Sequence, residues 1–339
     1  SQPRRRESPF RHCRKLLAAI APCAMIAVLA DLPRKDVMAA LTRLLTDRSD
    51  PARSRIETVP ALRAGPGEIV LSPDRFSLTT NNITYAVFGD AMRYWEFFPT
   101  GEAGWGQVPV WGFADIVESG VDGLEPGERV YGYFPIASHV VMKPERISER
   151  GFYDGAEHRQ PMAAIYNTYI FTAADPSYDK AFEAQQMLFR PLFTTGWMID
   201  DSLMETGDPI PETVVISSAS SKTAMALAHC LKERGNVDTV ALTSKGNKAF
   251  VESTKLYGRV RTYADVDRLH ARGLTAFVDF LGRPTLTADV HNALKDRLVR
   301  SLVIGVTDWE GNRAPIQLPD PNFSCSEGFA NGVTPPLVS

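Results

Sequence analysis

A serine-rich segment in the second half of the chain has residue types that could bind an anion. Residues 214–230 read VVISSASSKTAMALAHC, a β-branched run followed by a polar stretch and then by small, helix-forming residues. If these are a strand, a turn and a helix, the free N–H groups and dipole of the helix N-terminus would stabilise a pyrophosphate. The residues placed to contact it are Ser218, Ser220, Ser221 and Lys222.

This turn contains no glycine, whereas turns that bind dinucleotides use glycine so that no side chain holds the phosphates away. Serine is small, caps helices well and can donate a hydrogen bond to a phosphate. Two interpretations therefore remain open. The turn is either a modified phosphate cradle or a serine-rich cap on a buried helix that needs no ligand.

Cations and hydroxyls also follow the next β-branched run, VDTVALT. In a dinucleotide fold this position faces the adenosine ribose, where an acid selects a free 2′-hydroxyl and cations or hydroxyls select a 2′-phosphate. No acid follows this run directly, so the pattern favours NADP, the alternative being a solvated basic edge. The residues concerned are Ser244, Lys245 and Lys248, with Arg259, Arg261 and Tyr263 after the next predicted helix.

The elements that would position these residues alternate between strand and helix. Strands are predicted at TVVIS, VDTVALT, RVRTY, TAFVDF and RSLVIGV, and helices through His229, at NKAFVESTKLYG and at DVHNALKDRLV. Strands and helices alternating at this spacing pair in parallel through right-handed crossovers. We therefore predict a doubly wound domain over residues 191–312 and an irregular tail over 313–339.

The preceding region has a different pattern, with short alternating runs broken by glycine and proline: EIVLS, NITYAVFG, PVWGFADIVES, ERVYGYFP and HVVMKP. These predict a β-rich, barrel-like domain over residues 54–190. Its last part, 151–190, is interpreted as a connector, and WMIDDSLMETG as a linking helix. Residues 31–53 are expected to form a short amphipathic helix and a linker that ends near Arg53.

The composition limits the kinds of partner. The 339 residues carry a net charge of −3, which provides no basic field for nucleic acid, so a small molecule is the expected partner. The four cysteines form no C-x-x-C pair, which argues against a disulfide framework or a structural zinc site. We expect reduced thiols and a cytoplasmic location.

The N-terminal extension, residues 1–53, complicates this expectation. A basic stretch, SQPRRRESPFRHCRK, precedes an apolar run, LLAAIAPCAMIAVLA, in the manner of a signal peptide. The run is short for a membrane span and contains Pro22. A packed helix and a targeting signal both remain open.

Several stretches resemble the medium-chain dehydrogenase/reductase superfamily, particularly its zinc-free quinone and enoyl reductase branch. VPVWGFADIVESGVDGLEPGERVYGYF is similar to a block of its GroES-like domain, and VVISSASSKTAMALA stands where its glycine-rich turn belongs. The spacing of Ser244, Lys248 and Tyr263 is similar to that of the residues with which its quinone reductases hold the NADPH 2′-phosphate. The resemblance runs from about Ile56 to about Glu310.

A closer resemblance links NNITYAVFGDAMRYWEFFP, RPLFTT, SSASSKTA and GVTDWE to an uncharacterised family, catalogued as a domain of unknown function, that is related to those reductases. Together the resemblances imply an α/β fold, in which a GroES-like β-rich domain is followed by a doubly wound Rossmann domain. They also imply NADPH as cofactor and the possibility of a homodimer. The Gly-His-Glu element and the four-cysteine lobe of zinc alcohol dehydrogenases are missing, so no metal is expected.

The resemblance further implies candidate catalytic residues. Tyr85 falls where quinone reductases carry an active-site tyrosine, and Tyr94 falls near a second one. A tyrosine hydroxyl can donate a proton as negative charge develops on a reduced substrate. Asn81 and Asn82 could hydrogen-bond a carboxamide or a substrate carbonyl. The alternatives are core aromatic residues and turn-forming asparagines.

Further candidate site residues are suggested by their positions in the predicted helices and strands. Thr194 and Thr195 are expected at the start of the linking helix, where the superfamily has a threonine near the nicotinamide. Gly305 would let the nicotinamide approach the end of a strand, unless it is a simple turn glycine. His139 and Asp308 are further acid–base candidates.

Two functions are consistent with these patterns. One is an NADPH-dependent, zinc-free oxidoreductase that reduces a small apolar or conjugated carbonyl substrate at an activated C=C bond, or a quinone. The other is an inactive member of the fold that binds a ligand or partner.

Overall fold

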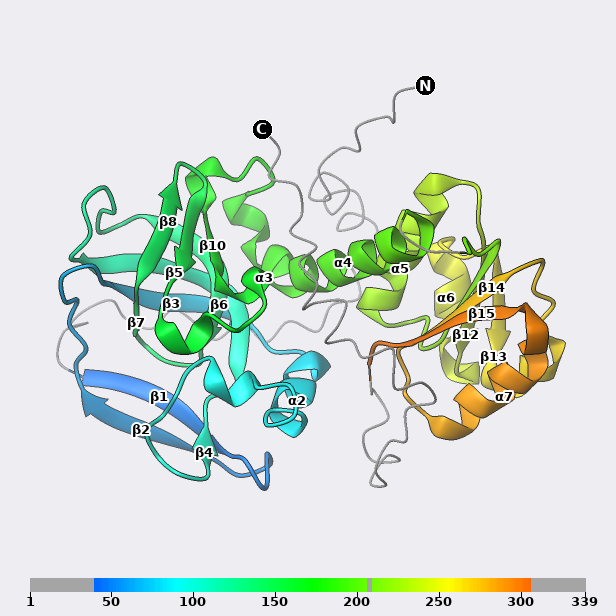
Figure 1. Ribbon diagram of the computed structural model, residues 1–339, viewed down its shortest axis with the longest axis horizontal. Helices are drawn as coiled ribbons and strands as arrows, with labels where there is room; N and C mark the ends of the chain where they lie inside the picture. Colours follow the sequence, from blue (N-terminus) through cyan, green and yellow to red (C-terminus); the bar gives the residue numbers. More distant parts are fainter. Residues whose placement is uncertain (1–39, 206–208, 306–339) are drawn as a thin grey trace. The chain divides into compact units, whose positions relative to one another are not determined.

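The computed structural model describes residues 40–205 and 209–305 (Figure 1). Residues 40–188 belong to one compact unit, and residues 189–205 and 209–305 to a second. The signal-like segment, Asp308 and the predicted tail lie outside the described residues. The predicted domain boundaries stay a prediction.

The first unit is built on an antiparallel sheet of seven strands in the order β7-β3-β5-β6-β10-β9-β8. Its central strands are the long apolar runs of the sequence, and they bury Ile69, Phe113, Val130 and Tyr133 in one hydrophobic core. The strands are β3 (Ile69–Ser77), β5 (Pro109–Ser119), β6 (Arg129–Pro135), β7 (Val140–Met142), β8 (Pro144–Ser148), β9 (Gly151–Asp154) and β10 (Thr168–Phe171). The predicted β-rich domain is confirmed.

Two short strands were missed within the predicted connector. β9 and β10 pair with each other, and β10 also pairs with β6, so this region is part of the sheet. Each strand has only four residues, which is too short for a clear alternation of apolar and polar positions.

Residues 40–47 form a strand, so the prediction of a helix there is wrong. β1 (Ala40–Asp47) pairs with β2 (Ser54–Pro60) and with β4 (Trp105–Gly106) in a separate three-stranded sheet. Arg43 and Glu57 are directly opposite each other, and the Arg43 guanidinium donates to the Glu57 carboxylate at 2.8 Å. Cross-strand pairing thus outweighs the helix propensity of this leucine-rich segment.

The segment NITYAVFG is also not the strand that its β-branched residues predicted. It lies in helix α2 (Thr80–Val87), because Thr79 and Asn82 form a capping box at the N-terminus. The Thr79 N–H donates to Asn82 Oδ1 at 2.7 Å, and the Asn81 N–H donates to Thr79 Oγ1 at 3.2 Å. Asn82, Tyr85 and Ala86 are buried with helical spacing.

The predicted linking helix is confirmed and is longer than expected, since α4 runs over Glu183–Met204 with Pro191 inside it. Proline lacks an N–H group, so the carbonyl four residues earlier loses its helical partner. That carbonyl belongs to Met187, and the Ser77 hydroxyl on β3 donates to it at 3.0 Å. The sheet therefore satisfies the group that proline leaves unpaired.

The second unit contains a five-stranded parallel sheet in the order β13-β12-β11-β14-β15. The strands are β11 (Thr213–Ile216), β12 (Asp238–Thr243), β13 (Arg259–Thr262), β14 (Thr275–Asp279) and β15 (Leu298–Val303). The helices between them are α5 (Lys222–Arg234), α6 (Lys248–Thr254) and α7 (Pro284–Leu294) (Figure 1). This order is that of the doubly wound Rossmann fold, and the predicted strands and helices are confirmed.

Alternating residues of the central strands face different cores, as expected for a sheet covered on both sides. Val240 and Leu242 belong to a cluster with Leu286 and Val290 of α7, whereas Ala241, between them, packs with Val251 of α6. Within the described residues, no helix is both long and apolar enough to cross a membrane.

A buried carboxylate joins the start of α4 to the sheet of the first unit. Glu183 is the first residue of α4, and its carboxylate accepts hydrogen bonds from Arg129 Nε at 2.7 Å and from the Tyr178 hydroxyl at 2.7 Å. Burial opposes ionisation of Glu183, but these bonds and the charges of Arg129 and Arg75 outweigh it, so its pKa is lowered.

We expect Glu183→Gln to destabilise the protein by about 2 kcal/mol, because Arg129 would lose a charged hydrogen bond to a buried carboxylate while keeping those to Asp74 and Asp115. The lowered pKa makes the contribution of Glu183 complete above its unfolded-state pKa of about 4.5 and lost as the pH falls through the lower folded-state value. Urea unfolding at pH 7 and in acid measures this difference. A difference between the two proteins that is constant with pH would contradict it.

Candidate functional site

The candidate binding residues of the second unit lie in turns at the carboxyl edge of its parallel sheet. Thr243 and Thr262 are Cα partners at the ends of β12 and β13, so Ser244 and Tyr263 begin neighbouring segments. The turn after β11 and the segment after β14 meet at the same edge, where strand order reverses and ligands bind in this fold.

A buried polar network fixes the turn after β11. Ser217 and Asp279 are both 0% exposed, and the Ser217 hydroxyl donates to Asp279 Oδ1 at 2.5 Å. The Leu281 and Gly282 N–H groups donate to the same carboxylate oxygen, and the Thr287 hydroxyl donates to Oδ2 at 2.9 Å. The sequence analysis missed Asp279, whose signal is a single acid at the end of an apolar strand.

The glycine-free turn uses the backbone conformation that glycine would adopt. Ser218 has a φ of 46°, in the left-handed region. Its carbonyl accepts from the Ser221 N–H at 2.7 Å, while the Ala219 N–H donates to the Leu242 carbonyl at 3.1 Å. Serine thus forms the tight turn at the cost of backbone strain.

The N-terminus of α5 has donors available for an anion. Ser221 is the N-cap, and its hydroxyl accepts from the Ala224 N–H at 3.3 Å. Among the described residues, no acceptor is bonded to the N–H groups of Lys222 and Thr223. These groups, together with partly exposed hydroxyls, fit a pyrophosphate, because unpaired N–H groups and the helix dipole both favour negative charge.

The predicted phosphate-binding segments contact each other. Asn247 Nδ2, in the 3₁₀ turn after β12, donates to Ser220 Oγ at 2.9 Å. Ser244 caps that turn, since its hydroxyl accepts from the Asn247 N–H at 3.3 Å, and Lys245 is exposed. Lys248 lies on the next turn, with its Nζ 3.9 Å from Glu252.

An acid that the sequence analysis overlooked follows β13. Asp265 Oδ2 accepts from the Thr262 N–H at 3.2 Å and from its hydroxyl at 2.7 Å. These bonds are the main reason that the Asp265 pKa is lowered, and the charges of Arg268 and Lys248 lower it further. Nearby, the Arg283 guanidinium lies 6.0 Å from the centre of the Tyr263 ring. The edge is therefore mixed in charge rather than purely basic.

Gly305 lies close to the end of β14. Its N–H donates to the Asp279 carbonyl at 3.4 Å, and a Cβ at this position would lie 3.1 Å from the Phe280 carbonyl oxygen. Gly305 therefore belongs to the same edge, and its close approach to the backbone favours glycine.

The expectation that Thr194 and Thr195 begin the linking helix is wrong, because α4 already begins at Glu183. Their hydroxyls donate to the carbonyls four residues earlier, those of Arg190 and Pro191, at 2.9 and 3.0 Å. Such bonds are usual for threonine inside a helix.

The catalytic candidates lie in the first unit and contact one another. Asn81 Nδ2 donates to the Tyr85 hydroxyl at 2.7 Å, one turn along α2. The Tyr85 and Tyr94 rings have centroids 4.5 Å apart, and the Tyr94 hydroxyl lies 3.3 Å from that of Tyr166. Tyr85 is buried, and this burial, followed by the proximity of Tyr94, raises its pKa above the ordinary value. It therefore keeps its proton at neutral pH.

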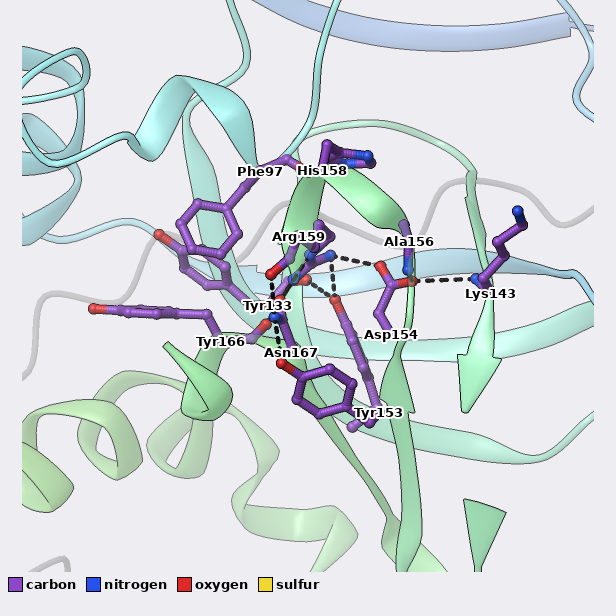
Figure 2. A network of polar contacts seen from close by, with 11 residues as sticks. Phe97, Tyr133, Lys143, Tyr153, Asp154, Ala156, His158, Arg159, Tyr166 and Asn167 are labelled. Carbon is purple, nitrogen blue, oxygen red and sulfur yellow. Dashed lines mark hydrogen bonds and ion pairs between the residues drawn. The ribbon is translucent and has the colours of Figure 1, made fainter. Parts of the chain in front are cut away.

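A buried arginine positions Tyr166, which the sequence analysis had not singled out. Arg159, only 1% exposed, donates to Asp154 Oδ2 at 3.0 Å, to Asn167 Oδ1 at 2.9 Å and to the Tyr166 carbonyl at 2.6 Å (Figure 2). The Tyr169 hydroxyl accepts from the same guanidinium at 3.0 Å. The Tyr169 hydroxyl in turn donates to the Tyr133 carbonyl on β6 at 2.5 Å. The network therefore joins the predicted connector to β6, and the Tyr133 and Tyr166 rings have centroids 4.8 Å apart.

Two other candidates have local roles. Asn82 Nδ2 donates to the Pro109 carbonyl at 2.9 Å, and its side chain caps α2. His139 is buried beside Ser138, with Nδ1 3.0 Å from the Ser138 hydroxyl, and burial lowers its pKa. The structure records no bond between His139 and the tyrosines. Over residues 40–205 and 209–305, no group of three or more His, Cys, Asp or Glu side chains could hold a metal ion.

Comparisons with known proteins agree with this architecture. The model of the family described as "Protein of unknown function (DUF2855)" matches residues 76–326. The crystal structure of CurA from Vibrio vulnificus is 12% identical, with a TM-score of 0.55 over 86% of this chain and 78% of that chain. CurA in complex with NADPH, from the same organism, is 11% identical, with a TM-score of 0.57 over 82% of this chain and 76% of that chain.

No curated protein matches the chain. At 11–12% identity, the likeness to CurA shows the fold alone. The predicted fold class is confirmed. The predicted membership of a family of unknown function is also confirmed, whereas the relation to the medium-chain dehydrogenase/reductase superfamily stays a prediction.

We expect Ser218→Gly to stabilise the protein by about 1 kcal/mol, because glycine adopts the left-handed conformation without strain. Ser218→Val should destabilise it by about 2 kcal/mol, since a β-branched residue is poorly tolerated there. Thermal unfolding of both variants measures these effects. Ser220→Gly is the matched control, because Ser220 does not have a positive φ and glycine would relieve no backbone strain there. This variant should lower the stability slightly. Stabilisation by both glycine variants would contradict the argument.

Proposed function

The chain belongs to the DUF2855 family, and we propose that it is an NADPH-dependent, zinc-free oxidoreductase that reduces an activated C=C bond or a quinone. The substrate would be a small apolar or conjugated carbonyl compound. A homodimer and a cytoplasmic location are part of this proposal. The alternative, an inactive member of the fold that binds a ligand or partner, is favoured by the absence of glycine from the turn.

The observation that carries the proposal is the bond between Asn247 and Ser220, which joins two predicted phosphate-binding segments at the edge where this fold binds ligands. The proposed pyrophosphate and 2′-phosphate segments are thus joined by a direct bond, which supports their use by one ligand. A solvated basic edge would have no need of a link between these segments.

Each group of residues has a role in this proposal. Ser218, Ser220, Ser221 and Lys222 would hold the pyrophosphate, and Ser244, Lys245, Lys248 and Tyr263 the 2′-phosphate. Gly305 and Thr195 would lie by the nicotinamide. NADPH, when bound, supplies the hydride that reduces the substrate.

Tyr85 would donate the proton that completes the reduction. A hydroxyl with a raised pKa is protonated at neutral pH and can hydrogen-bond a substrate oxygen on which charge develops. Asn81 orients this hydroxyl by its hydrogen bond, and Tyr94 packs against the ring.

Calorimetric titration tests the cofactor. We expect NADPH to bind more tightly than NADH, and Lys248→Ala to weaken NADPH by about tenfold, because a charged hydrogen bond to phosphate is lost. Lys232→Ala is the charge-matched control, since α5 ends at the opposite edge of the sheet. Absence of binding heat with either nucleotide from folded protein would exclude the oxidoreductase and favour the alternative.

Turnover measurements test the proton donor. With an enone or quinone that the protein reduces, Tyr85→Phe should lower kcat by about 100-fold without changing NADPH affinity. Tyr153→Phe, which removes a hydroxyl bonded to Asn167, is the control and should retain activity. Wild-type turnover by Tyr85→Phe would remove Tyr85 from the mechanism.

A further inference from the structure

Tyr257 reaches the glycine-free turn from a distant part of the chain. It follows α6 and precedes β13, and its ring packs against Ala219, Ala241 and Val251. Its hydroxyl donates to the Ala219 carbonyl at 2.8 Å. Burial raises the pKa of this hydroxyl above its ordinary value, so the donor keeps its proton.

This bond determines the direction of the next N–H group. In a trans peptide the carbonyl oxygen and the following N–H point in opposite directions. Because the Ala219 carbonyl oxygen points towards the Tyr257 hydroxyl, the Ser220 N–H must point away from Tyr257. We call this direction outward. The preceding peptide is also fixed, because the Ala219 N–H donates to the Leu242 carbonyl at 3.1 Å.

The opposite orientation of the peptide between residues 219 and 220 would harm anion binding. A flip would replace the outward N–H with a carbonyl oxygen, which repels phosphate. It would also leave the Tyr257 hydroxyl without this acceptor, in a place where an unmade hydrogen bond is costly. The tyrosine therefore selects one of the two orientations before any ligand arrives.

We propose that Tyr257 is a positioning residue for the pyrophosphate, which holds the peptide between Ala219 and Ser220 with its N–H directed outward. This inference rests on the proposed NADPH binding. Tyr257 itself need not touch the ligand.

Titration with fragments of the cofactor tests this role. Tyr257→Phe should weaken NADPH and inorganic pyrophosphate by about fivefold and leave 2′-AMP affinity within about twofold. Tyr263→Phe is the matched variant, and it should weaken 2′-AMP while leaving pyrophosphate unchanged. Because these are binding measurements, they need no knowledge of the substrate.

A second variant tests the same role if Tyr257→Phe fails to fold. Ala219→Gly keeps the tyrosine but loosens the same peptide, so it should also weaken pyrophosphate and spare 2′-AMP. The two losses should be less than additive in the double variant, because both free one peptide.

The outcomes separate this inference from the proposed function. If wild-type protein binds neither NADPH nor 2′-AMP, the proposed function fails and the inference fails with it. If wild-type binds both and Tyr257→Phe binds pyrophosphate equally well, only the role of Tyr257 is overturned. Equal losses for pyrophosphate and 2′-AMP would make Tyr257 a general structural residue and would also overturn it.

Discussion

The candidate edge of the second unit depends on one buried carboxylate. Asp279 ends β14 and accepts hydrogen bonds from Ser217, after β11, and from the backbone that follows β14. A buried carboxylate is tolerated only when its oxygens are satisfied, so the two strand ends must keep their relative positions. The Asp279 network therefore fixes the ends of β11 and β14, where the strand order reverses, and with them the start of the turn over residues 217–221.

The rigidity of this network explains how the turn can lack glycine. Glycine-rich turns gain close approach to phosphate, but they lose more chain entropy on folding. Here Ser218 adopts the strained conformation, and the bonds of Ala219 and Ser220 to other elements keep it there. The turn is then pre-organised, which reduces the ordering cost of binding but leaves less room beside the ligand.

Much of this fold follows from sequence patterns. The long apolar runs of β5 and β6 and the alternation after Thr213 suffice to predict both kinds of sheet. The failures arise where tertiary contacts or capping outweigh propensity. The leucine-rich segment around Leu44 becomes a strand because β2 pairs with it, and α2 forms because Thr79 and Asn82 cap a β-branched run. Asp279 and Tyr257 were missed because the bonds that give them their roles reach Ser217 and Ala219, 62 and 38 residues away.

The polar bonds around the turn also distinguish its two interpretations. Capping of α5 requires only Ser221, whose hydroxyl accepts the Ala224 N–H. The Asn247 bond to Ser220 and the Tyr257 bond to Ala219 do nothing for that cap, yet they fix the segment just before the free N–H groups of the helix. Lys248 follows Asn247 directly in the sequence, and Lys245 precedes it by two residues. The bonds of Asn247 and Tyr257 fix the shape of the turn beyond what the cap of α5 requires, and this supports the proposed anionic ligand over capping alone.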